Sequence, residues 1–218
     1  MLMTVNGGRV TLPGDTHYNR MKADLLGGRF PPGTVLHETA MSEVYGVSRT
    51  PVREALVRLA QDRLIERTTR GFVVRRRTPE EILEIYDARI ALEATAAALA
   101  AERRGEFDLQ LLASLHASST AETDDAARIR TNALFHLAIR SAARNGLIGA
   151  LLADLDDLLT ISTPDRSLGE PPERSIGEHA ELVEAIRRRD ADTARAIMST
   201  HLIRMRDLRV RTLLHERE

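Results

Sequence analysis

The second part of the chain carries apolar residues at helical spacing almost throughout. Between residues 79 and 214, apolar side chains recur every three or four positions, and no alternating pattern typical of a strand interrupts them. This spacing predicts an all-α antiparallel bundle. Its expected helices cover residues 79–104, 108–121, 124–143, 146–160, 172–189 and 191–214, with the longest loop at 163–172.

The first part is patterned differently, with short apolar segments separated by glycine and proline. Three short helices and a small hairpin are expected at about 17–27, 39–45, 48–62 and 64–74. Ser48 suits the N-cap of the third helix, and Gly71 suits the tip of the hairpin. Two short helices joined by a glycine turn are the layout of a helix-turn-helix, and the hairpin adds a wing. The sequence therefore predicts a mainly α protein that begins with a winged helix-turn-helix.

The two patterns meet at a clear boundary. Thr78-Pro79-Glu80-Glu81 matches a capping box, with Thr78 as the N-cap and Pro79 at the first helical position. Three arginines at 75–77 precede it and suggest a basic linker. The expected organisation is a flexible lead-in at 1–16, a winged helix-turn-helix at 17–75, a linker at 76–78 and a helical domain at 79–218.

Composition narrows the class of protein. No apolar run approaches the ~20 residues that span a bilayer, and charged residues make up 29% of the chain. The chain has no cysteine, which excludes disulfides, cysteine nucleophiles and thiolate metal sites. We expect a cytoplasmic protein that does not bind a membrane.

Charge is distributed unevenly, although the net charge of the whole chain is only −1. Residues 1–78 hold 13 Lys and Arg against 7 Asp and Glu, whereas residues 79–218 hold 18 against 25. A basic first part and an acidic second part indicate two tasks, and contact with a polyanion falls to the first.

The start of the third short helix carries the side chains that recognition of DNA requires. Arg49 and Arg53 lie one turn apart and point the same way, and arginine can bond guanine in a bidentate manner. The hairpin tip can approach the DNA backbone or the minor groove. The alternative is that these arginines only solvate a helix face. The predicted DNA contacts are Ser48, Arg49, Thr50, Arg53, Arg70 and Gly71.

These residues belong to a longer motif. Val47-Ser48-Arg49-Thr50-Pro51-Val52-Arg53-Glu54-Ala55-Leu56, followed by Arg70-Gly71-Phe72, resembles the winged helix-turn-helix of the GntR family of bacterial repressors. The resemblance covers about residues 17–75 and places Ser48, Arg49, Thr50, Arg53 and Gly71 on the family's DNA-contact positions. It also implies a homodimer on a palindromic double-stranded DNA operator, with half-sites about one helical turn apart.

Three histidines of the second part lie where apolar residues are expected. His179 and His201 fall on the apolar stripes of their helices, and His136 follows Asn132 by four residues on one helix face. A single inward histidine is usually a hydrogen-bonded core residue. Three from different helices of one bundle favour a metal site, and imidazole suits zinc, nickel or iron.

Arg89 and Glu93 also fall on an inward stripe, four residues apart. They can form an internal ion pair, or Arg89 can clamp the carboxylate of a ligand while Glu93 orients it. The sequence leaves both readings open.

The second part resembles the FCD ligand-sensing domain that follows the winged domain in one large GntR subfamily. The matching pieces over about 79–214 are Arg89-x-x-x-Glu93, Asn132-x-x-Phe135-His136 with Asn145, Glu178-His179 and Met198-x-x-His201-Leu202. Many members bind a divalent metal through one Asp and three His. The positions here are Asn132, His136, His179 and His201, and Asn132 departs from the pattern because its amide brings no negative charge.

Together these features predict a transcription regulator, in the usual case a repressor, and not an enzyme. Its effector is expected to be a small organic acid held beside a divalent metal, with zinc the first choice and nickel another. The expected effector contacts are Arg89, Glu93, Asn145, His136, His179 and His201. Two alternatives remain: a regulator for which the ion itself is the effector, and a metal-dependent enzyme fused to a DNA-binding domain. No partnered general base supports the enzyme.

Overall fold

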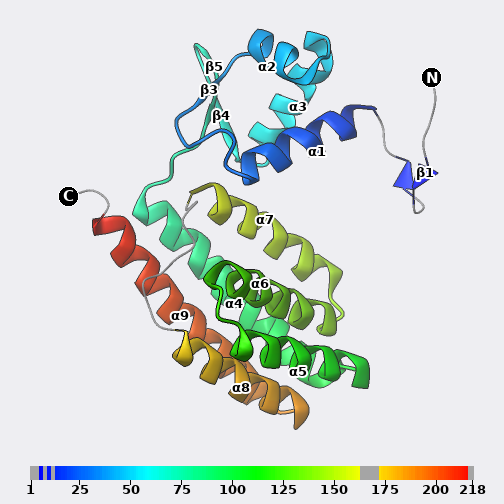
Figure 1. Ribbon diagram of the computed structural model, residues 1–218, viewed down its shortest axis with the longest axis vertical. Helices are drawn as coiled ribbons and strands as arrows, with labels where there is room; N and C mark the ends of the chain where they lie inside the picture. The colour runs from blue at the N-terminus through cyan, green and yellow to red at the C-terminus, as the bar shows by residue number, and fades with distance from the viewer. Residues whose placement is uncertain (1–4, 7–8, 11–12, 163–171, 216–218) are drawn as a thin grey trace. The chain divides into compact units, whose positions relative to one another are not determined.

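The computed structural model describes residues 5–6, 9–10, 13–162 and 172–215 (Figure 1). The chain divides into two compact units, one formed by residues 1–78 and 156–164 and the other by residues 79–155 and 165–218. Within the described ranges, none of the helices combines the length and the apolar character that crossing a bilayer requires.

The first unit is a winged helix-turn-helix, as predicted. It combines the helices α1, α2 and α3 with a three-stranded antiparallel sheet in the order β3-β5-β4, in which Val35 pairs with Val73 and Ile65 with Val74. α3 packs against α1 and α2. The elements are α1 (Pro13–Leu26), β3 (Val35–Leu36), α2 (Glu38–Tyr45), α3 (Arg49–Gln61), β4 (Ile65–Thr68) and β5 (Gly71–Val74).

The N-terminal segment differs from the expected flexible lead-in at 1–16. β1 (Val5–Asn6) pairs with β2 (Arg9–Val10), and α1 begins at Pro13, four residues earlier than predicted. Proline suits a first helical turn because its missing N–H has no intrahelical acceptor there. β3 was also not predicted, because two residues are too few to show a strand period.

Glycine is required at the wing for a reason internal to the fold. Gly71 has φ 129°, and a Cβ at this position would lie 3.1 Å from the carbonyl oxygen of Leu36. β3 therefore approaches the tip of the hairpin closely, and a side chain would strain both the backbone and the sheet.

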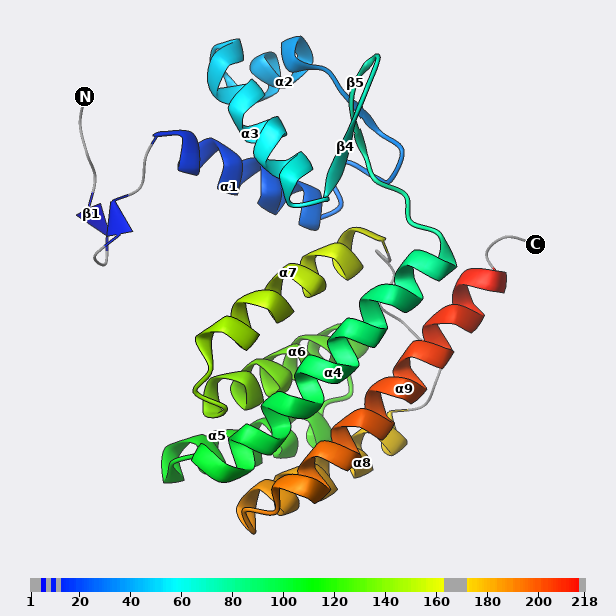
Figure 2. The same ribbon diagram turned by 180° about the vertical axis from the view of Figure 1, so that it is seen from behind.

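The second unit is a bundle of helices whose bounds agree with the prediction to within two residues. α4 and α9 run side by side and antiparallel (Figures 1 and 2). The last residues of α7 belong to the first unit, and the predicted loop 163–172, except Pro172, lies outside the described residues. The helices are α4 (Pro79–Arg103), α5 (Glu106–Ala121), α6 (Asp125–Ala142), α7 (Gly146–Ser162), α8 (Glu173–Arg187) and α9 (Ala191–His215).

Small residues let the helices of this bundle approach closely. Ala97, Ala100 and Ala101 of α4 are fully buried against a core that includes Leu112 and Ile186. The alanine-rich part of α4 therefore forms the centre of the bundle.

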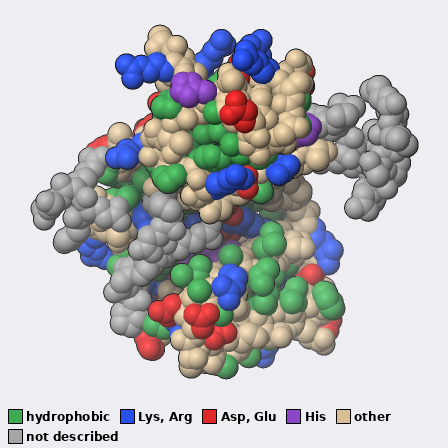
Figure 3. All heavy atoms as spheres, turned by 45° about the horizontal axis from the view of Figure 1, so that its top comes forward, with side chains coloured by type: hydrophobic (Ala, Val, Ile, Leu, Met, Phe, Trp, Pro, Cys, Tyr) green, Lys and Arg blue, Asp and Glu red, His purple; other side chains and the backbone are tan. Residues whose placement is uncertain are grey.

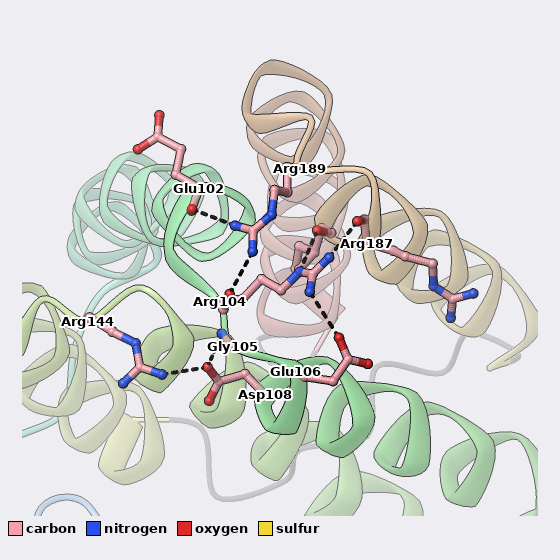
Figure 4. Close-up of polar contacts among 9 residues, drawn as sticks. Glu102, Arg104, Gly105, Glu106, Asp108, Arg144, Arg187 and Arg189 are labelled. Carbon is pink, nitrogen blue, oxygen red and sulfur yellow. Dashed lines mark hydrogen bonds and ion pairs between the residues drawn. The ribbon is translucent and has the colours of Figure 1, made fainter.

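At one end of the bundle, arginines satisfy the carbonyl groups where helices stop (Figure 4). Arg189 donates to the carbonyl oxygens of Glu102 at 2.8 Å and Arg104 at 3.2 Å, and Arg104 donates to that of Arg187 at 2.8 Å. The last carbonyls of a helix have no intrahelical donor, so these bonds fill a need of the backbone. We call Arg104, Arg144 and Arg189 the arginine cap.

Two members of the arginine cap have a left-handed backbone. Arg144 has φ 48° and Arg189 φ 59°, each just after the end of a helix. The amide of Arg189 donates to Ile186 O and that of Asp190 to Ala185 O, which is the Schellman arrangement that usually has glycine at this position. Arginine occupies this position here, and its side chain links the end of α8 to the end of α4 through a hydrogen bond to the carbonyl oxygen of Glu102.

Candidate DNA-binding surface and histidine cluster

The start of α3 presents a polar row to solvent. Ser48, Arg49, Thr50 and Arg53 are exposed, whereas the apolar side of the helix is buried through Val52, Ala55, Leu56 and Leu59. Ser48 occupies the N-cap position in an extended conformation, but its side chain makes no capping hydrogen bond. The predicted capping bond is therefore absent, and the hydroxyl group stays available.

Arg53 is held in place by a carboxylate that the sequence analysis did not select. Its Nε donates to Glu38 Oε1 at 2.9 Å and its Nη2 donates to Glu38 Oε2 at 2.8 Å. Hydrogen bonding from Arg53 lowers the pKa of Glu38. The Arg53 side chain remains 66% exposed, so the bidentate pair leaves its outer edge open.

The other arginines of the first unit have different surroundings. Arg70 at the wing tip is exposed, and Lys and Arg side chains stand out from the top of this unit in Figure 3. Arg58, by contrast, lies 4.1 Å from the centre of the Tyr18 ring. Not every arginine of the basic first part therefore faces a partner outside the protein.

The expected basic linker is only partly correct. Arg77 is buried and donates to the carbonyl oxygen of Arg63 at 2.5 Å and to Ser162 Oγ at 2.9 Å. Arg76, its neighbour, is exposed. Charge alone could not reveal that Arg77 fixes the end of the winged unit.

In the helical unit, three histidines meet in the interior. His136 of α6, His179 of α8 and His201 of α9 are each 4% exposed. One ring nitrogen from each lies within 4.8 Å of the others. The Phe135 ring stacks on His179 with centroids 4.5 Å apart and closes one side. The predicted inward orientation of all three is confirmed. We call them the histidine cluster.

Two rings of the histidine cluster, His136 and His179, are uncharged at neutral pH. Burial, followed by the neighbouring histidines, lowers the pKa of His136, and burial together with His201 lowers that of His179 to about 3. Nδ1 of His136 and Nε2 of His179 are buried without a hydrogen-bond partner among the described residues. Neutral rings with unused lone pairs are what a divalent metal ion binds.

A buried carboxylate lies beside the cluster. Glu93 is fully buried, and its Oε1 accepts from Arg140 Nη2 at 2.6 Å. Arg89 Nη2 lies 3.6 Å and His136 Nδ1 3.8 Å from the same oxygen. The predicted Arg89–Glu93 contact exists, but Arg140 is the closer partner. Its place four residues after His136 was the signal that the sequence analysis missed.

A second carboxylate, that of Glu178 on α8, contacts the cluster at His201. Glu178 Oε2 lies 2.6 Å from His201 Nδ1, and Glu178 Oε1 accepts from Arg204 Nε at 2.9 Å. Burial opposes ionisation of Glu178, but the hydrogen bonds from His201 and Arg204 outweigh it and bring the pKa to about 2. The Glu178-His179 motif alone does not reveal this contact, because Glu178 pairs with residues of another helix.

The two predicted asparagines differ from the histidines. Asn132 lies one turn before His136 on α6 and is half-buried. Asn145 Oδ1 accepts from the backbone N–H of Ile148 at 3.2 Å and so caps the start of α7. The amide nitrogen of Asn145 is not used in this cap.

The residues present fit a metal ion. Tetrahedral zinc would hold nitrogen ligands about 3.4 Å apart, so modest ring movements would bring the cluster from its present spacing to coordination. The unpartnered nitrogens of His136 and His179 are the structural sign of such a site, because an unpaired polar atom in the interior is unfavourable unless something binds it.

Two families match the chain. Residues 14–74 match the bacterial regulatory proteins of the gntR family, and residues 84–204, more than half of the chain, match the FCD domain.

Relatives agree with this assignment. The HTH-type transcriptional regulator YdhC of Bacillus subtilis (strain 168) is 30% identical over 84% of this chain and 85% of its own. The HTH-type transcriptional repressor RspR of Escherichia coli (strain K12) is 31% identical over 85% of this chain and 83% of its own. The solved structure of E. coli McbR/YncC, 23% identical, covers 96% of this chain and 100% of its own with a TM-score of 0.73, which shows a shared fold. The chain therefore belongs to the GntR family of DNA-binding transcription regulators, in the group with an FCD domain, and not to the enzymes.

Proposed function

We propose that this regulator is a cytoplasmic repressor whose affinity for its operator is set by a small carboxylate bound next to a divalent metal in the helical domain. Residues 17–75 serve as the DNA-binding domain and residues 79–218 as the sensing and dimerisation domain. The observation that carries the proposal is the buried histidine cluster, in which two ring nitrogens have no hydrogen-bond partner among the described residues.

On DNA, α3 enters the major groove of each operator half-site with its N-terminal end at the bases. Arg49 and Arg53 read base edges, and Ser48 and Thr50 bond phosphates or bases. Arg70 and Gly71 at the wing approach the backbone. A homodimer then reads a palindrome.

In the helical domain, His136, His179 and His201 hold zinc or nickel, with Asn132 as a neutral fourth ligand. The metal supplies an attachment point for an oxygen of the effector. Arg89 pairs with the carboxylate of the effector, and the amide nitrogen of Asn145 can add a hydrogen bond. Glu93 is already paired with Arg140 and orients Arg89.

Effector binding changes operator affinity through the residues that join the two domains. A coupling free energy of ~1–3 kcal/mol changes affinity about 5- to 150-fold. The joining segment includes Arg77, whose hydrogen bonds to Arg63 and Ser162 fix one end of it.

The test combines metal analysis with operator binding. Tag-free protein is analysed for bound metal, and gel shifts are measured with and without a chelator and with a panel of hydroxy acids. We expect about one zinc or nickel per chain, no metal in His179→Ala, and an operator affinity that responds to one class of acid only when metal is present. Arg188→Ala, an exposed change at the end of α8, is the control.

Two results would overturn parts of the proposal. Metal-free protein whose operator affinity still responds to acids would remove the metal and leave the histidines as direct effector contacts. An affinity that follows the metal concentration without any acid would instead make the ion the effector.

A further inference from the structure

His201 differs from the other two histidines in having a fixed partner. Its Nδ1 lies 2.6 Å from Glu178 Oε2, while Nδ1 of His136 and Nε2 of His179 have no hydrogen-bond partner among the described residues. The three rings are equally buried, so the difference is not one of solvent access.

Glu178 is itself held from its other side. Arg204 approaches both carboxylate oxygens, with Nε 2.9 Å from Oε1 and Nη2 2.5 Å from Oε2. Nη2 also donates to Ser175 Oγ at 3.0 Å. The Arg204 side chain is 9% exposed. A buried bidentate arginine keeps the carboxylate ionised and fixes its plane.

An ionised carboxylate can only accept hydrogen bonds. The proton between His201 Nδ1 and Glu178 Oε2 must therefore be carried by Nδ1, because the other tautomer would place a nitrogen lone pair against a carboxylate oxygen at 2.6 Å. Nε2 is then the ring nitrogen left to bind a metal, and the position of the ring is set before any metal arrives.

We infer that Glu178, held by Arg204, is the positioning residue that fixes the tautomer and orientation of His201 and makes this histidine the preorganised ligand of the cluster. The inference rests on the proposed metal site. His136 and His179 then complete the coordination around a ligand that is already in place, as carboxylates behind metal-bound histidines do elsewhere.

The first measurement is ¹⁵N NMR of the histidine ring nitrogens in the full-length, chelator-treated protein. Wild-type His201 should be the tautomer with the proton on Nδ1. Glu178→Gln should populate both tautomers, because the amide can present either an acceptor or a donor to the ring. Glu178→Asp, which keeps the carboxylate, should retain the wild-type tautomer. A wild-type ring with the proton on Nε2 would overturn the inference without any variant.

The second measurement is zinc affinity by competition with a chromophoric chelator. Glu178→Gln should bind zinc about 10- to 100-fold more weakly than the wild type, and Glu178→Asp should recover part of the loss. Glu181→Gln, an exposed change on the same helix, should bind like the wild type.

The two proposals fail in different ways. Zinc binding by the wild type with equal affinity in Glu178→Gln overturns the role of Glu178 and leaves the metal site standing. A wild type that does not bind zinc or nickel overturns the metal site, and the role of Glu178 with it.

Discussion

The two polar clusters of the helical unit are built in opposite ways. In the arginine cap, guanidinium groups meet acceptors: Arg189 meets the carbonyl oxygens of Glu102 and Arg104, and Arg144 meets the carboxylate of Asp108. In the histidine cluster, ring nitrogens of His136 and His179 lie buried with no hydrogen-bond partner among the described residues. The arginine cap satisfies hydrogen-bond acceptors of the protein itself, whereas the histidine cluster leaves ring nitrogens without a hydrogen-bond partner in the described part of the chain.

This difference separates a stabilising cluster from the cluster that we propose as a binding site. A buried polar atom without a partner costs about 1–3 kcal/mol, so a bound ion or ligand at the His136 and His179 nitrogens would relieve this cost. Helix ends impose the opposite demand, because their carbonyl groups need donors at all times. Whether each polar atom has a hydrogen-bond partner therefore distinguishes the two clusters better than the number of charged side chains in them.

The largest effect is expected at the ion pair that borders the histidine cluster. Glu93→Ala would leave Arg140 buried without its carboxylate, and loss of one partner of a buried pair costs about 3–5 kcal/mol. Guanidinium unfolding followed by circular dichroism would measure this loss. Glu84→Ala, exposed on the same helix, is the control. Equal unfolding free energies for the two variants would contradict a buried pair.

A smaller effect is expected from pH in chelator-treated protein. The pKa of His179 falls from its ordinary value of 6.5 to about 3 on folding, so below pH 6.5 the unfolded chain binds more protons than the folded one. The contribution of His179 to the free energy of unfolding is fully present above pH 6.5. It declines as the pH falls towards 3, by up to about 1.4 kcal/mol per pH unit for each such histidine. His136 shifts in the same direction.

Urea unfolding between pH 7.5 and 5 would measure this decline. The lowered pKa of Glu178, about 2 against an ordinary 4.5, acts below this range, so the window isolates the histidines. His179→Leu should make the slope shallower. A stability that rises on acidification would show that the rings are not buried neutral.

The smallest effect is expected in the arginine cap. Arg189→Ala loses two hydrogen bonds on an exposed side chain and keeps the left-handed backbone, which should lower the unfolding free energy by about 0.5–1.5 kcal/mol. Arg189→Gly loses the same bonds but relieves the backbone strain, so it should be more stable than Arg189→Ala. Zinc affinity should be unchanged in both. A loss of metal binding in either variant would contradict the view that the arginine cap only stabilises the fold.

The apolar period predicted the bundle and part of the site, because the period of each helix determines which of its own residues face inward. The inward positions of His179 and His201 follow from their places on apolar stripes, and these positions are confirmed. The partners of Glu93 could not be ranked in the same way. Arg89, four residues away, was visible, but Arg140 comes from another helix 47 residues along the chain. Such pairing depends on how helices pack.

The winged unit shows a second limit of the sequence. The three-residue arginine run was interpreted as a linker from its charge, yet Arg77 is buried. β3 is too short for a period, and Pro13 was not used as the start of α1. For Arg77 and β3 the conformation depends on partners far along the chain, Ser162 in one case and β5 in the other.

Glu38 has a consequence for how the protein would select its operator. A guanidinium group has two hydrogen-bonding edges, and Glu38 occupies the one formed by Nε and Nη2 of Arg53. The edge that bears Nη1 remains, already aligned, as a fork that matches O6 and N7 of guanine. If Arg53 contacts DNA as proposed, Glu38 would add to selectivity: without Glu38, Arg53 would be drawn to any nearby phosphate, and the protein would distinguish its operator less well from other DNA.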